Sequence, residues 1–302
     1  MGIVRGRWVL ARRSFPTASI ASGPKALEEG IVSAVRSLRG SFRGPLGSLG
    51  VGVPGLVLYP QGVVRTCINV HAWKNVPLQA RLRRRLGIPV RVDNDVHAMT
   101  LAEWRYGAGR GARNLVCVTL GTGVGGGFIL NGRLYRSRLG PSAEIGHVAV
   151  GETGLACSCG GTACLERYVG NKDVIRALRR KLQAGRKSQI TRLAGGRLDR
   201  ITPEMVDRAC ELGDRLAIET WDEAGRKIGL VLAKVATLLS PDRIVIGGGL
   251  ANAGHWLFDP IRRTLRERAM RSLGRIPVVP ARLGLSAGLI GAALLGEEAS
   301  AE

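Results

Sequence analysis

Residues 115–135 read LVCVTLGTGVGGGFILNGRLY. The first six form a largely apolar run that is typical of a buried strand, and the Asn131-Gly132 pair near the end predicts a β-hairpin. Three glycines between these two features match the pattern G-x-G-x-x-G. A dinucleotide-binding fold requires a helix directly after that pattern, with its N-terminus at the pyrophosphate. Because a hairpin follows instead, the segment predicts a strand–turn–strand unit and argues against a dinucleotide-binding fold.

The glycine turn is a candidate phosphate-binding loop. Its backbone N–H groups and the Thr122 hydroxyl suit phosphate oxygens, and a tight turn without a ligand is the alternative. A second glycine group follows the predicted strand 243–246 and lets another molecule, such as an adenosine ring, approach the backbone closely. A plain turn at the end of a strand is the alternative there. The candidate nucleotide-binding residues are Gly121, Thr122, Gly123, Gly125, Gly247, Gly248 and Gly249.

Strand and helix patterns alternate on both sides of this stretch. Such alternation is typical of an α/β protein with a parallel sheet. A polar linker is predicted over 188–200. Apolar spacing predicts helices over 24–38, 77–86, 96–106, 172–182, 214–239 and from 286 onward, and strands over 6–13, 47–53, 89–92, 243–246 and 277–281.

Polar residues gather where the strand 89–92 meets the helix that follows, at Asp93, Asn94 and Asp95. Folds with a parallel sheet bind ligands at the carboxyl edge of the strands. Two carboxylates at such an edge suit a general base and a hydrogen-bond acceptor. The alternative is that Asp95 only caps the helix.

Three of the six cysteines crowd together downstream of a histidine, and the four candidate metal ligands are His147, Cys157, Cys159 and Cys164. Three thiolates and one imidazole suit tetrahedral zinc, and four protein ligands leave no position for a water molecule. The metal would therefore be structural, and it would also fix Glu166, which closely follows the last cysteine. Reduced cysteines without a ligand are the alternative.

Glu144 and His147 flank Ile145-Gly146, just ahead of an apolar run. If this segment is buried, both polar side chains need hydrogen-bond partners. An exposed glutamate beside a histidine with satisfied hydrogen bonds is the alternative.

The chain of 302 residues carries a net charge of +22, almost all of it from arginine. Much of this charge falls on segments with helical spacing, which is typical of solvated helix faces. The sequence contains no recognisable nucleic-acid-binding motif beside these charges, which argues against a nucleic-acid partner. Basic charge also favours smaller polyanions such as nucleotides or inorganic polyphosphate. No apolar run approaches the ~18 residues of a membrane helix, and the start lacks a signal peptide, so we expect a cytoplasmic protein.

Taken together, these motifs resemble the ROK family of sugar kinases and sugar-responsive repressors, and its bacterial glucokinases most closely. The cysteine-rich element with its upstream Glu-Ile-Gly-His is highly specific to that family. The resemblance runs from about residue 6 to residue 296. It is carried by Gly52-Val-Pro-Gly55, Val92-Asp-Asn-Asp95, Leu120-Gly-Thr-Gly-Val-Gly-Gly-Gly127, Ala143-Glu-Ile-Gly-His147, Cys157-Ser-Cys-Gly-Gly-Thr-Ala-Cys-Leu-Glu166, Ile246-Gly-Gly-Gly249 and Ala287-Gly-Leu-Ile-Gly-Ala-Ala293.

The resemblance implies the actin-like, ribonuclease-H-like ATPase fold, in which two α/β lobes close around a cleft. Residues 1–99 and 286–302 would form the smaller lobe, and residues 100–285 the larger lobe with the zinc loop. It also implies a homodimer or homotetramer. A ROK repressor would carry an N-terminal DNA-binding domain, for which this chain has no room.

The implied activity is ATP-dependent phosphorylation of a hexose, most simply glucose, with Mg²⁺ bound to the ATP. Asp95 matches the general base that accepts the proton of the sugar 6-hydroxyl. The motifs do not separate glucose from mannose, fructose or an N-acetylated hexosamine. The residues that match sugar ligands are Gly55, Asn94, Glu144, His147 and Glu166.

One departure from the family is large, because the usual opening strand and its phosphate loop D-x-G-G-T have no counterpart here. The first strands of the N-terminal lobe are therefore expected to be missing. Either the reading frame continues upstream of Met1 and encodes this loop, or the protein is a sugar-binding relative with impaired catalysis. In both cases we expect weak phosphoryl transfer from these 302 residues alone.

Overall fold

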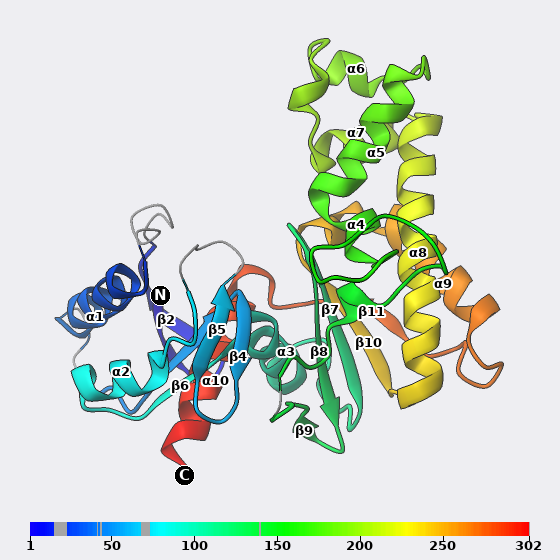
Figure 1. The fold of residues 1–302 in the computed structure, drawn as a ribbon. Coiled ribbons are helices and arrows are strands. Elements are labelled where there is room, and N and C mark those ends of the chain that lie inside the picture. Colours follow the sequence, from blue (N-terminus) through cyan, green and yellow to red (C-terminus); the bar gives the residue numbers. More distant parts are fainter. Residues whose placement is uncertain (15–22, 41, 43, 68–72, 139, 302) are drawn as a thin grey trace. The chain divides into compact units, whose positions relative to one another are not determined.

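The computed structural model describes the chain except for residues 15–22, 41, 43, 68–72, 139 and 302, and it forms two compact units (Figure 1). None of the described helices has the length and apolar character needed to cross a membrane. The first unit is Met1–Ala112, Gly127–Ala143 and Ala281–Glu302, and the second is Arg113–Gly126 and Glu144–Pro280.

The first unit contains three two-stranded sheets among its described residues. The sequence predicted one strand over 6–13, but Gly6, with φ +58°, turns the chain and produces a hairpin instead. A second hairpin, β4–β5, was not predicted. The pairs are β1 (Gly2–Arg5) with β2 (Trp8–Arg12), antiparallel; β3 (Leu49–Val53) with β6 (Val90–Asn94), parallel; and β4 (Gly55–Leu58) with β5 (Val63–Cys67), antiparallel.

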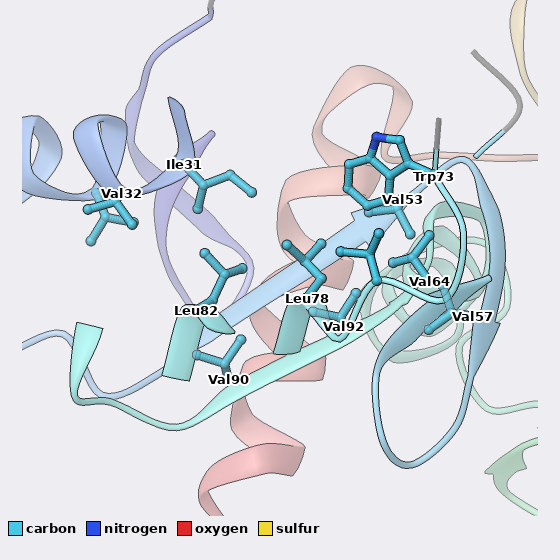
Figure 2. Packing of buried hydrophobic residues seen from close by; sticks show 12 residues of the cluster. Ile31, Val32, Val53, Val57, Val64, Trp73, Leu78, Leu82, Val90 and Val92 are labelled. Carbon is cyan, nitrogen blue, oxygen red and sulfur yellow. The ribbon is translucent and has the colours of Figure 1, made fainter. Parts of the chain in front are cut away.

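Helices α1 (Pro24–Gly40) and α2 (Leu78–Leu86) cover one face of the β3–β6 pair. Apolar residues at helical spacing give each helix one buried stripe. Ile31 and Val32 of α1 and Leu78 and Leu82 of α2 pack into one core with valines of the strands (Figure 2). Burial of each such side chain contributes about 1.5–3 kcal/mol relative to exposure.

Helices α3 (Asp95–Tyr106) and α10 (Ala287–Ser300) pack against each other on the opposite face. Glycines allow this close packing. A Cβ at Gly291 would lie 1.8 Å from the Ala98 carbonyl oxygen, and one at Gly50 would overlap the carbonyl oxygen of Ala292. The predicted lobe boundary at residue 99 falls inside α3, whereas the structure keeps the whole helix in the first unit because it packs against α10.

The second unit is built on the strand order β11-β10-β7-β8. β10 pairs in parallel with both of its neighbours. The chain passes from the second unit to the first inside β8, which then pairs with the short strand β9 (Arg133–Leu134) in the predicted hairpin. The bounds are β7 (Leu115–Leu120), β8 (Val124–Leu130), β10 (Arg243–Gly247) and β11 (Val278–Pro280).

The longest described helix of the second unit, α8, packs against α9 through two glycines. A Cβ at Gly225 would lie 2.8 Å from the Leu257 carbonyl oxygen, and one at Gly229 would lie 2.8 Å from that of Ile261. The predicted linker 188–200 contains the short helix α6 and a 3-10 turn. The helices are α4 (Glu166–Val169), α5 (Asn171–Gln183), α6 (Ile190–Leu193), α7 (Pro203–Glu211), α8 (Arg215–Leu239) and α9 (His255–Arg268).

Candidate active site and metal cluster

Asn94 caps α3 at the carboxyl end of β6. Its side-chain oxygen accepts hydrogen bonds from the N–H groups of Val96 (2.8 Å) and His97 (3.2 Å). Its side-chain nitrogen donates to the Gly55 carbonyl at 3.1 Å. Gly55 must be glycine, because a Cβ there would lie 2.1 Å from the Thr66 carbonyl oxygen. The structure thus brings two of the predicted sugar ligands together.

Asp95 is the first residue of α3 and is half-buried. Its carboxylate accepts one hydrogen bond from the adjacent Val96 N–H at 3.0 Å, and the side chain lines a cavity of the first unit. Burial raises the pKa of Asp95, and this effect outweighs the opposing hydrogen bonds from backbone N–H groups. A carboxylate with a raised pKa that does not cap its helix can serve as a general base.

Asp93 lies beneath these two residues in a buried polar network. Its carboxylate accepts from the Asn94 N–H (2.7 Å), contacts His97 Nδ1 (2.9 Å) and accepts from Arg136 Nε (2.6 Å). Arg136 also donates to Glu298 of α10 at 2.8 Å. Burial opposes ionisation, but His97 and Arg136 hold the pKa of Asp93 below its usual value. The network therefore fixes the end of β6 from which Asp95 follows.

The cysteine loop of the second unit is a tight, paired turn. The Cys157 N–H donates to the Gly161 carbonyl at 2.8 Å, and Gly160 takes a positive φ of 95°. Isolated bridges pair Ala149 with Cys164 and Ala156 with Thr162. These pairings bring the segment that contains His147 against the loop.

The four predicted metal ligands converge. Their ligand atoms all lie within 4.8 Å of one another. The Cys159 and Cys164 sulfurs are 3.6 Å apart, and the Cys157 sulfur lies 3.6 Å from His147 Nδ1. Ligands at about 2.3 Å from a tetrahedral ion would be roughly 3.8 Å apart, so the donor set and its dimensions fit zinc.

Glu166 links this loop to the glycine turn. It begins α4 and accepts a hydrogen bond from the Val124 N–H at 2.9 Å. Gly123 packs closely on this side chain, since a Cβ there would lie 2.4 Å from a Glu166 carboxylate oxygen and would displace it. Glu144 is exposed, and its carbonyl accepts from the His147 N–H at 3.0 Å.

The two glycine groups lie side by side at the carboxyl edge of the sheet. Gly247 of β10 is registered against Thr119 of β7, just ahead of the turn at 121–123. A Cβ at Gly248 would lie 2.2 Å from the Leu120 carbonyl oxygen. Gly249, in contrast, has no atom within 4 Å of its Cβ position and leaves room above it.

The profile of the ROK family matches residues 6–299. The chain belongs to the ROK family. It is 33% identical over 294 residues to a glucokinase from Streptomyces coelicolor, and the match covers 96% of this chain and 91% of that protein. Its fold is similar to that of a ROK glucokinase from Streptomyces griseus in complex with glucose and AMPPNP, with a TM-score of 0.77, 34% identity and coverage of 89% and 88%. A ROK hexokinase from Thermus thermophilus gives a TM-score of 0.80, 28% identity and coverage of 100% and 95%.

These similarities confirm the predicted actin-like ATPase fold for this ROK protein. The predicted site residues fall into two groups, one in each unit. Gly55, Asn94 and Asp95 lie in the first unit. The second unit contains the predicted metal ligands, the other predicted sugar ligands and all seven predicted nucleotide ligands.

Three polar residues that lie at these sites in this ROK protein were not predicted from the sequence. His97 and Arg136 bind Asp93, and the Asn171 N–H donates to the Gly121 carbonyl at 2.9 Å where α5 begins. The Asn171 side-chain oxygen is buried without a hydrogen-bond partner among the described residues. The spacing of Asp93 and His97, four residues apart across a helix start, was an available signal. Arg136 gave none, because it follows an unrelated hairpin.

Proposed function

We propose that this ROK protein, a sugar kinase of the hexokinase and glucokinase type, transfers the γ-phosphoryl group of ATP to the 6-hydroxyl of a hexose, with glucose as the expected substrate. The observation that carries the proposal is the Asp95 carboxylate, which is half-buried, has a raised pKa and does not cap its helix. The similarity to glucokinases supports the choice of glucose.

In the proposed reaction, the Asp95 carboxylate accepts the proton of the 6-hydroxyl as that oxygen attacks the γ-phosphorus. The bond from phosphorus to the bridging oxygen breaks, and ADP leaves with the electron pair. A raised pKa makes the carboxylate a stronger base at neutral pH than an ordinary aspartate. Asn94 assists because its side chain caps the N-terminus of α3, so the Asp95 carboxylate is not needed as the cap and can act as the base.

In the first unit, we propose Asn94 and the Gly55 backbone as ligands of sugar hydroxyls. In the second unit, the candidates for this role are Glu144, His147 and Glu166. His147 Nδ1 contacts the Cys157 sulfur, so Nε2 is the ring nitrogen that would bind a sugar hydroxyl. One histidine can therefore serve the metal and the sugar at once.

The glycine turn at 121–123 and the second glycine group would hold the triphosphate and the adenosine of MgATP. Two features support this assignment: the exposed Thr122, and the start of the 13-residue helix α5 beside Gly121. Backbone N–H groups and a helix N-terminus both favour phosphate oxygens. Magnesium that arrives with ATP neutralises charge on the transferred group.

We also propose that His147, Cys157, Cys159 and Cys164 bind one structural zinc ion. The ion would join the loop to the segment that carries Glu144 and thereby fix the orientation of His147. Through the short connection from Cys164 it would also hold Glu166 at the glycine turn.

A direct test is incubation of the purified protein with MgATP labelled at the γ-phosphate and, separately, glucose, mannose, fructose, N-acetylglucosamine and N-acetylmannosamine. We expect label in glucose 6-phosphate, identified by NMR. Inorganic polyphosphate without ATP is expected to give none, because the basic surface lies largely on solvated helices. Release of label only as inorganic phosphate, or phosphorylation at another hydroxyl, would contradict the proposal.

A further inference from the structure

Two strand pairs of the first unit border one cavity. Among the described strands, β1 pairs only with β2, and β3 pairs only with β6. Residues of both β1 and β3 line the same cavity of about 660 Å³. Each of these strands has one edge that no other described strand occupies.

Backbone groups on these free edges lie at the cavity. Met1 and Arg13 exchange two backbone hydrogen bonds of 2.8 Å, so the next residue, Gly2, directs its N–H and C=O to the opposite edge. The Leu49 N–H donates to the Pro89 carbonyl at 2.9 Å. By the same alternation, Gly50 and Gly52 direct their backbone groups away from β6. All three glycines line the cavity.

Helices cover the cavity on both faces. α10 packs against β1, β2 and β3. A Cβ at Gly2 would lie 3.2 Å from a Leu289 methyl carbon, which places this helix under β1 as well as under β3. Ile31, Val35 and Leu38 of α1 line the cavity too. The cavity is therefore a gap within one layer of strands between two helical layers.

The burial pattern agrees with a gap in the sheet. Residues 90–93 of β6 are all buried, including Arg91 and Asp93. Residues 49–52 of β3 are only half-buried. β3, whose residues line the cavity, is therefore less buried than β6, the strand with which it pairs.

We propose that this cavity is an acceptor site for one extended, apolar peptide strand of about five residues, matched to the lengths of its neighbours. The bound strand would join the two pairs in the order β2-β1-peptide-β3-β6. Donors and acceptors on both edges require a peptide backbone, which a lipid chain or a small apolar molecule would not supply. Helices on both faces require apolar side chains. Asp95 lines the same cavity, so the bound strand would lie beside the candidate base.

The test uses the 302-residue protein and the blocked peptide acetyl-KVVIGVK-amide. The control peptide carries proline in place of the central isoleucine, which removes one backbone donor. At saturation, we expect amide hydrogen exchange at Gly2, Gly50 and Gly52 to slow roughly tenfold or more. The thermal unfolding midpoint should rise by a few degrees. The proline peptide should cause neither change.

A matched pair of variants locates the site. Leu289→Trp fills the cavity and should weaken peptide binding about tenfold or more, whereas Leu285→Trp, at a position 85% exposed and outside the cavity, should leave binding unchanged. Absence of binding at millimolar peptide, equal binding of the proline peptide, or unchanged exchange at the three glycines would overturn the proposal. None of these measurements depends on kinase activity, so they stand or fall apart from the proposed function.

Discussion

At the residue scale, Asn94 and Asp95 divide two tasks between adjacent side chains. The Asn94 side chain accepts hydrogen bonds from two N–H groups in the first turn of α3. These donors have no partner within the helix itself. The Asp95 carboxylate accepts a hydrogen bond from the Val96 N–H and does not cap the helix. Burial then raises its pKa, because the charged form is poorly solvated.

This shift predicts the pH dependence of catalysis. A general base must be ionised, so kcat/KM should fall as pH decreases through the pKa of Asp95. Because burial raises that pKa, the acid limb should lie above the ordinary value of 3.8. Initial rates at subsaturating glucose across a pH series measure the limb. A profile that stays flat down to pH 3.8 would exclude this role.

Arg136 is expected to matter for stability. Arg136→Met removes the cation between Asp93 and Glu298 and leaves Asp93 buried, so unfolding should become easier by about 3 kcal/mol. The lowered pKa of Asp93 means that its stabilising effect is present at neutral pH and is lost as pH falls below 3.8.

Urea denaturation at pH 7 measures the change for Arg136→Met. The control is Arg197→Met, which breaks a salt bridge between side chains that are 57% and 65% exposed and should leave the free energy of unfolding nearly unchanged. Equal changes in the free energy of unfolding for the two substitutions would show that the buried network stabilises the protein no more than an exposed salt bridge does.

At the scale of single elements, the cysteine loop should hold one zinc ion per chain. Elemental analysis of the purified protein measures this directly. Cys159→Ser should lose the metal and lower the thermal midpoint, since three ligands bind more weakly than four. Cys67→Ser, outside the cluster, should retain it. Full zinc occupancy in Cys159→Ser, or none in the unmodified protein, would refute the assignment.

The second glycine group offers a matched pair of substitutions. Gly248 has φ +89° and no room for a Cβ beside Leu120, so Gly248→Ala should destabilise the protein by about 2–3 kcal/mol. Gly249→Ala meets open space and should cost less than about 0.5 kcal/mol. Chemical denaturation of both variants decides the matter, and similar stabilities would contradict the observed packing of Gly248 on β7.

At the scale of the whole molecule, local patterns predicted most elements of the fold. The apolar run 115–120 is β7 to the residue, and the helix predicted over 96–106 is α3, which begins one residue earlier. The β4–β5 hairpin was not predicted, although Pro60 and Gly62 in its connection are residues typical of turns. The cap at α3 was ambiguous for a physical reason, since Asn and Asp are nearly equal as N-caps.

The candidate site was predictable where ligands cluster in sequence, as in the cysteine loop. It was not predictable where contacts join distant segments. Neither the hydrogen bond from Val124 to Glu166 nor the approach of Arg136 to Asp93 leaves a mark in local composition. Assembly into a homodimer or homotetramer stays a prediction, which light scattering would measure.

The measurement that tests the central claim most directly compares Asp95→Asn with the unmodified protein. Asparagine keeps the shape of the side chain but cannot accept the proton. We predict that glucose binding measured by calorimetry stays within a few-fold, while transfer of the labelled γ-phosphoryl group to glucose falls by roughly 10²–10⁴-fold. Transfer at an undiminished rate in Asp95→Asn would contradict the account.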